Sequence, residues 1–173
     1  MTTTKRIQGM SYDELSALYK EHYGEDRPTT RLHPSRTHDD DGNYRQLWFY
    51  PIWYYYVMTI DDKPVAWRGY KCEVWFYTDN DCDTIMHVGD TYTVPEYRNK
   101  GCLTEVKQYH RRLHNTTEIM GTMNSDEWYL KSLVNDGFEI NPQPKAYGCY
   151  WEFAKYYTDD RDGRWAVRQP TDR

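Results

Sequence analysis

The chain has 173 residues, about the size of a single domain, and its 22 basic and 27 acidic residues leave a net charge of −5. Leu, Ile, Val and Phe together number only 26, which raises the question of disorder, but 18 Tyr and 7 Trp supply large rings for a core. The small net charge excludes the usual disordered class, and its sign argues against non-specific nucleic-acid binding.

Two further classes are excluded by the order of the residues. No apolar run approaches the roughly 20 residues of a membrane helix, and the charged N-terminus has no apolar segment behind it. The cysteines are far apart and form no Cys-x-x-Cys pair. We therefore expect free thiols in a reducing compartment, a cytoplasmic location and no membrane partner.

The first half of the chain is predicted as a helix, a loop and three strands. Ser11 and Glu14 form a capping box before an apolar repeat of helical spacing, which Gly24 ends. Residues 25–45 are polar and are predicted as loop, with room for a short second helix. Aromatic and β-branched residues then predict strands over 47–60, 65–77 and 85–94.

In the second half the apolar period becomes helical. A helix with apolar positions from Leu103 to Leu113 precedes a short strand over 118–123 and a second helix, which Ser125 caps and Gly137 ends. Two closing strands are predicted over 138–140 and 148–156. The order αβββαβαββ predicts one α/β or α+β domain with a mixed sheet over 1–157. Residues 158–173 are predicted as a charged tail, docked at most by Trp165 and Val167.

The most informative stretch runs from Tyr92 to Thr104 and consists of a strand end, a basic turn and a helix start. Helix N-termini present unpaired N–H groups and the positive end of the dipole, so such a turn can hold a diphosphate. Arg98 and Lys100 add positive charge, and Gly101 permits close approach of the backbone. The alternative is an ordinary strand-to-helix connection with solvated basic side chains.

Residues 94–101 resemble motif A of the GNAT family of N-acetyltransferases, whose signature is Gln/Arg-x-x-Gly-x-Gly/Ala. Residues 124–138, which end in Asn135-Asp136-Gly137-Phe138, are similar to the second motif of that family. The similarity covers 85–157, and the element order extends it to 7–157. It implies a mixed, mostly antiparallel central sheet flanked by helices.

The resemblance also implies a site for acetyl-CoA as cosubstrate. Backbone amides from Arg98 to Thr104 would hold its pyrophosphate, and the strand end around Thr93 would pair with its pantetheine arm. The cofactor-binding residues implied are Tyr92, Thr93, Val94, Arg98, Asn99, Lys100, Gly101, Cys102, Leu103, Thr104 and Asn124.

Two residues depart from the family pattern. Leu103 stands where the signature has Gly or Ala, and it would crowd the pyrophosphate unless the stripe Leu103-Val106-His110 turns it into the sheet. Leu133 stands where the family often has the Tyr that protonates the departing thiolate. Tyr129 lies one turn earlier on the same face, about 5.4 Å away along the axis, and is the candidate acid if the helix is shifted.

A general base can be sought on the strand before Pro95. Asp90 shares a strand face with Met86, Val88, Tyr92 and Val94, and a partly desolvated carboxylate there could take a proton from an amine. The alternatives are a bulge that turns Asp90 to solvent and a partner such as Arg68 or Lys71. His87 is the second candidate base, with a buried structural histidine as its alternative.

No metal site is expected. Asp79-Asp81-Asp83 and Asp39-Asp41-Asn43 have calcium-loop spacing but lack the other required ligands, and neither His33 with His38 nor His110 with His114 has a supporting ligand set. The aromatic residues 48–56 could stack nucleic-acid bases, although a core strand that also lines an acceptor cleft explains them more simply.

The leading hypothesis is an acyltransferase that moves an acetyl group from acetyl-CoA to the amine of a small molecule or protein by direct attack in a ternary complex. The alternative is a catalytically inactive GNAT-like fold that acts as an interaction or structural component. Leu103 and Leu133 favour that alternative. Divergent GNAT-like chains are encoded by bacteriophages, so it would place a viral protein in the virion, with a protein partner or a second copy of itself.

Overall fold

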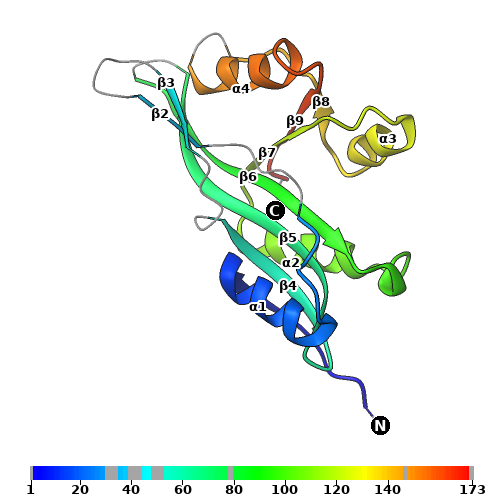
Figure 1. Cartoon of the computed structure of the whole chain (residues 1–173). Coiled ribbons are helices and arrows are strands. Elements are labelled where there is room, and N and C mark those ends of the chain that lie inside the picture. The colour runs from blue at the N-terminus through cyan, green and yellow to red at the C-terminus, as the bar shows by residue number, and fades with distance from the viewer. Residues whose placement is uncertain are drawn as a thin grey trace. The chain divides into compact units, whose positions relative to one another are not determined.

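The computed structural model describes residues 2–29, 53–77, 80–145 and 148–171 in full, and 35–38 and 44–47 as backbone strands. Figure 1 shows the elements in chain order. The helices are α1 (Tyr12–Tyr23), the short 3₁₀ helix η2 (Pro95–Tyr97), α2 (Cys102–Leu113), α3 (Glu127–Asn135) and α4 (Cys149–Thr158). The strands are β1 (Lys5–Ser11), β2 (Ser35–His38), β3 (Tyr44–Leu47), β4 (Tyr54–Ile60), β5 (Lys63–Phe76), β6 (Cys82–Thr93), β7 (Thr117–Thr122), β8 (Glu139–Ile140) and β9 (Arg164–Arg168).

Seven strands form one sheet in the order β1-β4-β5-β6-β7-β9-β8, while β2 and β3 pair separately. β6 and β7 run parallel, whereas β1 with β4, β4 with β5, β7 with β9 and β8 with β9 are antiparallel. The predicted mixed, mostly antiparallel sheet with flanking helices is therefore confirmed. No helix in the described part of the chain is both long and apolar enough to cross a membrane.

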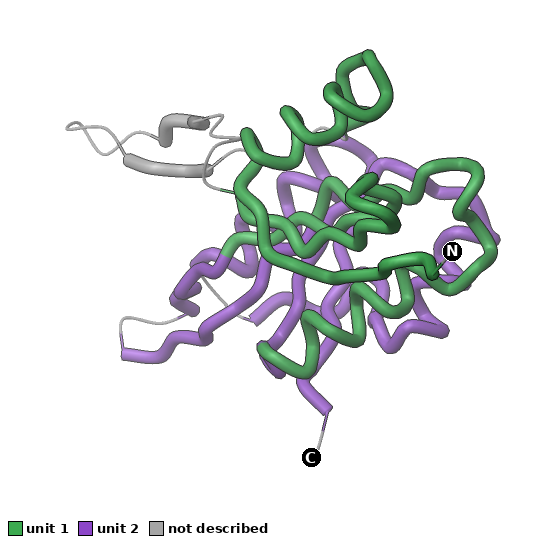
Figure 2. Tube along the Cα trace, turned by 90° about the horizontal axis from the view of Figure 1, so that it is seen from below, with its two compact units in different colours: residues 1–71, 89–113 green, residues 72–88, 114–173 purple. Residues whose placement is uncertain are grey.

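The chain divides into two compact units, which Figure 2 shows in different colours: Met1–Lys71 with Gly89–Leu113, and Cys72–Val88 with His114–Arg173. In the first unit, alternate residues of β4 point to opposite faces of the sheet. Tyr55 and Val57 pack with Leu15 and Tyr19 of α1. Met58 packs on the other face, in the cluster that contains Cys102 and Val106 of α2.

The core of the second unit is built mainly from aromatic side chains. Phe153 and Tyr157 of α4 pack with Trp165 of β9 and with Ile119 of β7. Gly121 of β7 lies against the Tyr157 ring so closely that a Cβ there would be 2.0 Å from a ring carbon. Large rings thus supply the buried area that the low aliphatic content cannot.

The helix predictions for α1, α2 and α3 are confirmed. Ser11 and Glu14 exchange the two hydrogen bonds of a capping box, and Gly24 ends α1 with φ of 73°. Gly137 follows α3 with φ of 95°, and the Phe138 N–H donates to Leu133 O at 3.0 Å. The α3 cap differs from the prediction, because Asp126 rather than Ser125 is the first cap residue.

Four secondary-structure predictions are wrong. Residues 148–156 were expected as a strand, but Cys149–Thr158 is helix α4. Residues 164–168 of the expected tail form β9, which lies between β7 and β8. β1 was not predicted, and β2 and β3 stand where a loop was expected.

β1 gives little signal in the sequence because most of its side chains are exposed; its pairing with β4 decides its structure. The expected strand over 47–60 is confirmed from Tyr54 on, and residues 48–52 lie outside the described residues.

Candidate functional site

The turn between β6 and α2 begins at Val94, which is anchored to the sheet. Val94 is buried, and its N–H donates to Val65 O on β5 at 2.8 Å. The N–H groups of Tyr97 and Arg98 then donate to Val94 O and Pro95 O, at 2.9 and 3.2 Å. These bonds form the 3₁₀ helix η2, and they engage the Arg98 amide, which the resemblance had implied as a ligand of the pyrophosphate.

The backbone amides of the next residues, 99–104, differ from these in their backbone conformation and hydrogen bonding. Asn99 and Gly101 have positive φ, 61° and 78°, and the first hydrogen bond of α2 runs from Glu105 N–H to Gly101 O at 3.0 Å. For the backbone amides of residues 99–104, all of which the structure describes, no hydrogen bond of ordinary geometry is recorded. Left-handed residues before a helix start create a concave row of N–H groups that suits an anion.

Two exposed basic side chains flank this row. The Arg98 Nε donates to Thr93 O at 3.0 Å, and the guanidinium lies 5.3 Å from the Tyr92 ring centroid. The Lys100 Nζ lies 5.6 Å from the Tyr97 ring centroid. Arg98 therefore folds back on the end of β6, where it engages a carbonyl that the resemblance had assigned to the pantetheine arm.

The face of α2 toward the sheet differs from the expected stripe. Cys102, Val106 and His110 are the buried positions, and Leu103 is only half-buried and lies outside the core cluster. Leu103 is therefore not among the residues by which α2 packs in this cluster.

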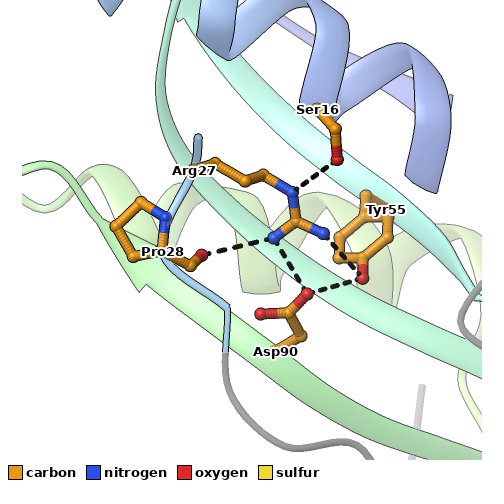
Figure 3. Close-up of polar contacts among 5 residues, drawn as sticks. All are labelled: Ser16, Arg27, Pro28, Tyr55 and Asp90. Carbon is orange, nitrogen blue, oxygen red and sulfur yellow. Dashed lines mark hydrogen bonds and ion pairs between the residues drawn. The ribbon is translucent and has the colours of Figure 1, made fainter. Parts of the chain in front are cut away.

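Asp90 lies in a buried charge network on the α1 face of the sheet, shown in Figure 3. Its Oδ2 is 2.9 Å from an Arg27 Nη, and both side chains are 1% exposed. The Tyr55 hydroxyl donates to the same Oδ2 at 2.6 Å. Asp90 itself has φ of 49°, an irregular backbone that places the carboxylate beneath α1.

The Arg27 guanidinium is fixed by hydrogen bonds and by contacts with aromatic rings. Its Nε donates to Ser16 Oγ of α1 at 3.1 Å, and an Nη donates to the Tyr55 hydroxyl at 3.1 Å. The guanidinium also lies over the rings of Tyr12 and Tyr55, at 4.7 and 4.9 Å from their centroids. Burial and the neighbouring carboxylate raise the pKa of Tyr55, so its hydroxyl stays a donor to Asp90 at neutral pH.

The prediction that Asp90 shares a face with Tyr92 and Val94 fits this arrangement, since all three contact the α1 side. Arg27 was missed as its partner because the two are far apart in sequence and Arg27 sits in a polar segment. Of the two alternative partners, Arg68 contacts His110 of α2 at 3.0 Å, and the Lys71 Nζ lies 5.7 Å from the centroid of the Trp53 ring. The role of Asp90 as a base stays a prediction.

His87 lies in the second unit, in the part of β6 that pairs with β7. It is 2% exposed, and its ring meets Trp75 and Phe153 edge-on, at 6.5 and 5.1 Å between centroids. The recorded pairing of β6 with β7 covers only Ile85–His87. His87 therefore lies at the last paired position and is packed as a core histidine.

Tyr129 and Asn124 lie near the C-terminal end of β7. Burial raises the pKa of Tyr129, and the neighbouring Thr122 side chain acts in the opposite direction. Leu133, in the family's usual tyrosine position, is buried in the core at 6% exposure. The Asn124 side chain accepts from the Asp126 N–H at 2.9 Å, so it serves the start of α3.

The comparisons with known proteins point to one fold. No protein-family model matches the sequence, and no curated protein matches it. Among solved structures, nourseothricin acetyltransferase aligns over 96% of this chain and 99% of its own, with a TM-score of 0.50 and 13% identity. The chain has the GNAT acetyltransferase fold.

A second solved structure that aligns with the chain contains acetyl coenzyme A. A candidate streptothricin acetyltransferase from Bacillus anthracis str. Ames, in complex with acetyl coenzyme A, aligns over 96% of this chain and 99% of its own, with a TM-score of 0.50 and 11% identity. A conserved protein of unknown function from Enterococcus faecalis V583 aligns over 80% of this chain and 33% of its own, with a TM-score of 0.47 and 14% identity. The chain thus spans about a third of that protein.

Proposed function

We propose that the chain is an N-acetyltransferase that moves the acetyl group of acetyl-CoA to an amine. One observation carries the proposal: in a GNAT fold, the amides of residues 99–104 at the head of α2 donate no hydrogen bond of ordinary geometry within the described part of the chain. Such a row of donors at the positive end of a 12-residue helix favours a diphosphate.

The residues around the row fit the cosubstrate. Arg98 and Lys100 are exposed and would neutralise the diphosphate. Apart from the two neighbours of Gly101 in the chain, no atom of the described residues lies within 4 Å of the place that a Cβ on Gly101 would take, so these residues leave the turn open. β6 from Gly89 to Thr93 lies beyond its pairing with β7 and would present its edge to the pantetheine arm, once Arg98 turns from Thr93 O to the diphosphate. Acetyl-CoA supplies the activated acyl group as a thioester.

Two residues of the chain are proposed to handle protons. Tyr129, whose pKa is raised by burial, keeps its hydroxyl proton at neutral pH and would donate it to the leaving thiolate. Asp90 would take the proton of the amine, directly or through water. That step leaves the buried Arg27 without its counter-charge, so a positioning role for Asp90 is the competing proposal.

The GNAT-like fold without catalysis remains the second candidate. The half-buried Leu103 beside the amide row and the buried Leu133 in the usual acid position favour it. It predicts the same fold, with weak or no binding of acetyl-CoA and no transfer.

The first experiment is calorimetric titration with acetyl-CoA. We expect micromolar binding to the wild-type chain and a loss of at least tenfold in affinity for the variant Arg98→Ala with Lys100→Ala. Lys131→Ala, on the exposed side of α3, is the matched control and should bind like wild type. Absence of heat for the wild type at high acetyl-CoA would remove the proposal.

The second experiment separates the two roles of Asp90 through release of the CoA thiol in the presence of a panel of primary amines. If Asp90 is the base, Asp90→Asn loses on the order of 100-fold or more in kcat with unchanged acetyl-CoA affinity, and Arg27→Met, which keeps the carboxylate, loses far less. Equal losses in the two variants, corrected for the folded fraction, would instead assign Asp90 a positioning role.

A further inference from the structure

Four side chains of the second unit form a cluster at the start of α4, which we call the Lys145 corner: Tyr77, Asp83, Lys145 and Tyr150. The Lys145 Nζ forms an ion pair with Asp83 Oδ2. It also lies 4.4 Å from the centroid of the Tyr77 ring and 5.0 Å from that of Tyr150. The ammonium is therefore held by two ring faces and one carboxylate.

The walls of the corner are fixed by contacts that do not involve Lys145. Tyr150 is 3% exposed and packs edge-on against Trp75, with centroids 5.3 Å apart. Its hydroxyl donates to Asp83 Oδ2 at 2.6 Å. The rings of Tyr77 and Tyr150 are 6.3 Å apart and inclined at 62°, so they form two sides of an angle. A preformed site loses little conformational freedom when a ligand enters it.

The base of α4 adds to this rigidity. Gly148 precedes the helix with φ of 83°, and a Cβ there would lie 2.2 Å from Phe76 O at the end of β5. Tyr150, two residues on, is thus held against the strand that leads to Tyr77. The Tyr150 wall of the Lys145 corner therefore belongs to the packed core of the second unit.

The occupant is less firmly held than the walls. The Lys145 side chain is 44% exposed and belongs to the connection between β8 and α4, outside any helix or strand. The connection contains Pro142 and Pro144, so leaving the corner requires no helix or strand to unfold. Lysine side chains have high rotamer entropy, which favours such a release.

The charge of the corner suits an organic cation. Burial acts to raise the pKa of Asp83, but the hydrogen bonds from Lys145 and Tyr150 outweigh it and hold that pKa below its ordinary value of 3.8. The carboxylate is therefore negative at neutral pH. Aromatic faces around one negative charge are the arrangement that proteins use to recognise alkylammonium groups.

We propose that the Lys145 corner is a binding site for an alkylammonium group, primary or quaternary, and that Lys145 occupies it as an internal ligand. An external ammonium ion competes with Lys145, whose tether gives it a high local concentration. The site therefore opens when Lys145 is removed or loses its charge. This inference does not depend on acetyl transfer.

The experiment is a titration of Lys145→Ala with n-butylammonium chloride and tetramethylammonium chloride, followed by NMR of the ring resonances of Tyr77 and Tyr150. We expect saturable shifts of both rings, with affinity at least tenfold higher in Lys145→Ala than in the wild type. Lys131→Ala, which leaves the corner intact, should match the wild type. Equal affinity in wild type and Lys145→Ala would overturn the internal-ligand assignment.

Further controls separate the corner from non-specific effects. Sodium chloride at equal ionic strength and the neutral tert-butyl alcohol should cause no saturable shift. Adding Tyr77→Leu or Asp83→Asn to Lys145→Ala should abolish binding. Shifts that persist in these variants, or that the neutral alcohol reproduces, would refute the site.

A measurement on the wild-type chain covers the case in which Lys145→Ala fails to fold. The Lys145 ε-methylene resonances should be shifted by the two rings, and n-butylammonium should move them toward the values of free lysine. Unshifted resonances, or resonances that n-butylammonium leaves in place, would equally overturn the proposal.

Discussion

Arg27 and Asp90 join α1, β4 and β6 through one buried pair of charges. Both side chains are 1% exposed, and Tyr55 and Ser16 complete their hydrogen bonds. A buried pair of this kind adds little net stability over apolar residues, but removal of one partner leaves an uncompensated charge. The pair therefore constrains which substitutions the first unit tolerates.

We expect Arg27→Met to lower the free energy of unfolding by about 3–5 kcal/mol, because Asp90 then keeps a buried charge without its partner. Asp90→Asn should be destabilising for the same reason. The double variant should lose clearly less than the sum of the two, as measured by urea denaturation in a double-mutant cycle. Additive losses would show that the two charges do not depend on each other.

For single residues, the sequence predicted the strand face on which a side chain lies better than it predicted the residue that the side chain contacts. Period-2 alternation predicted Asp90 on the face of Tyr92 and Val94, and its carboxylate lies on that face although the backbone of Asp90 is irregular, with φ of 49°. Arg27 was not predicted as its partner, since the tertiary fold brings a polar segment after α1 onto β6. The row of amides was predicted from Gly101 and the start of the following helix. The hydrogen bond that engages the Arg98 amide and the partial burial of Leu103 were not predicted, because both depend on the folded structure.

Among the elements, α4 shows where the sequence rules conflict. Its aromatic residues favour a strand by propensity, yet four of its five buried positions, Tyr150, Phe153, Ala154 and Tyr157, follow the period of a helix. That period was present in the sequence and outweighs propensity. The sequence of β9 contains only three consecutive apolar residues, Trp165, Ala166 and Val167, which is a weak strand signal. It forms a strand because β7 and β8 pair with it on its two sides.

The packing of α4 on β7 leads to a prediction about glycine. In Gly121→Ala the new methyl group would lie 2.0 Å from a carbon of the buried Tyr157 ring, so we expect a loss of about 1–3 kcal/mol or more in the free energy of unfolding. Gly9→Ala in β1 is the matched control. Its nearest neighbour would be 3.9 Å away, so thermal unfolding of that variant should match or exceed the wild type. Equal melting temperatures for both variants would contradict the close packing.

For the molecule as a whole, the aromatic core sets the response to alkaline pH. Burial raises the pKa of Tyr23, Tyr55 and Tyr150 above the ordinary value of 10.0. The folded state thus favours the neutral phenols, whereas the unfolded chain ionises them near pH 10. The stability from these groups is fully present below about pH 10 and is lost as the pH rises above it.

We therefore expect the free energy of unfolding to fall steadily from about pH 9 to 12, and tyrosinate absorbance to rise together with the loss of folded circular dichroism. Tyr55→Phe should flatten this dependence, since it removes one of the phenols whose pKa is raised. Stability that does not change across that range would show that these phenols are accessible in the folded state.

The fold class was predictable from the order of elements and from the strand-turn-helix motif. The edge strand β1 and the last strand β9 were not predictable, because pairing with neighbouring strands defines them.

The central claim of the proposed function is that the backbone amides at the start of α2, and in the turn before it, are available to bind a diphosphate. The most direct measurement is a titration of the ¹⁵N-labelled chain with acetyl-CoA, followed through its amide resonances. The account predicts the largest shifts at the amides of residues 99–104. Binding that leaves those resonances in place, or no binding at all, would contradict it.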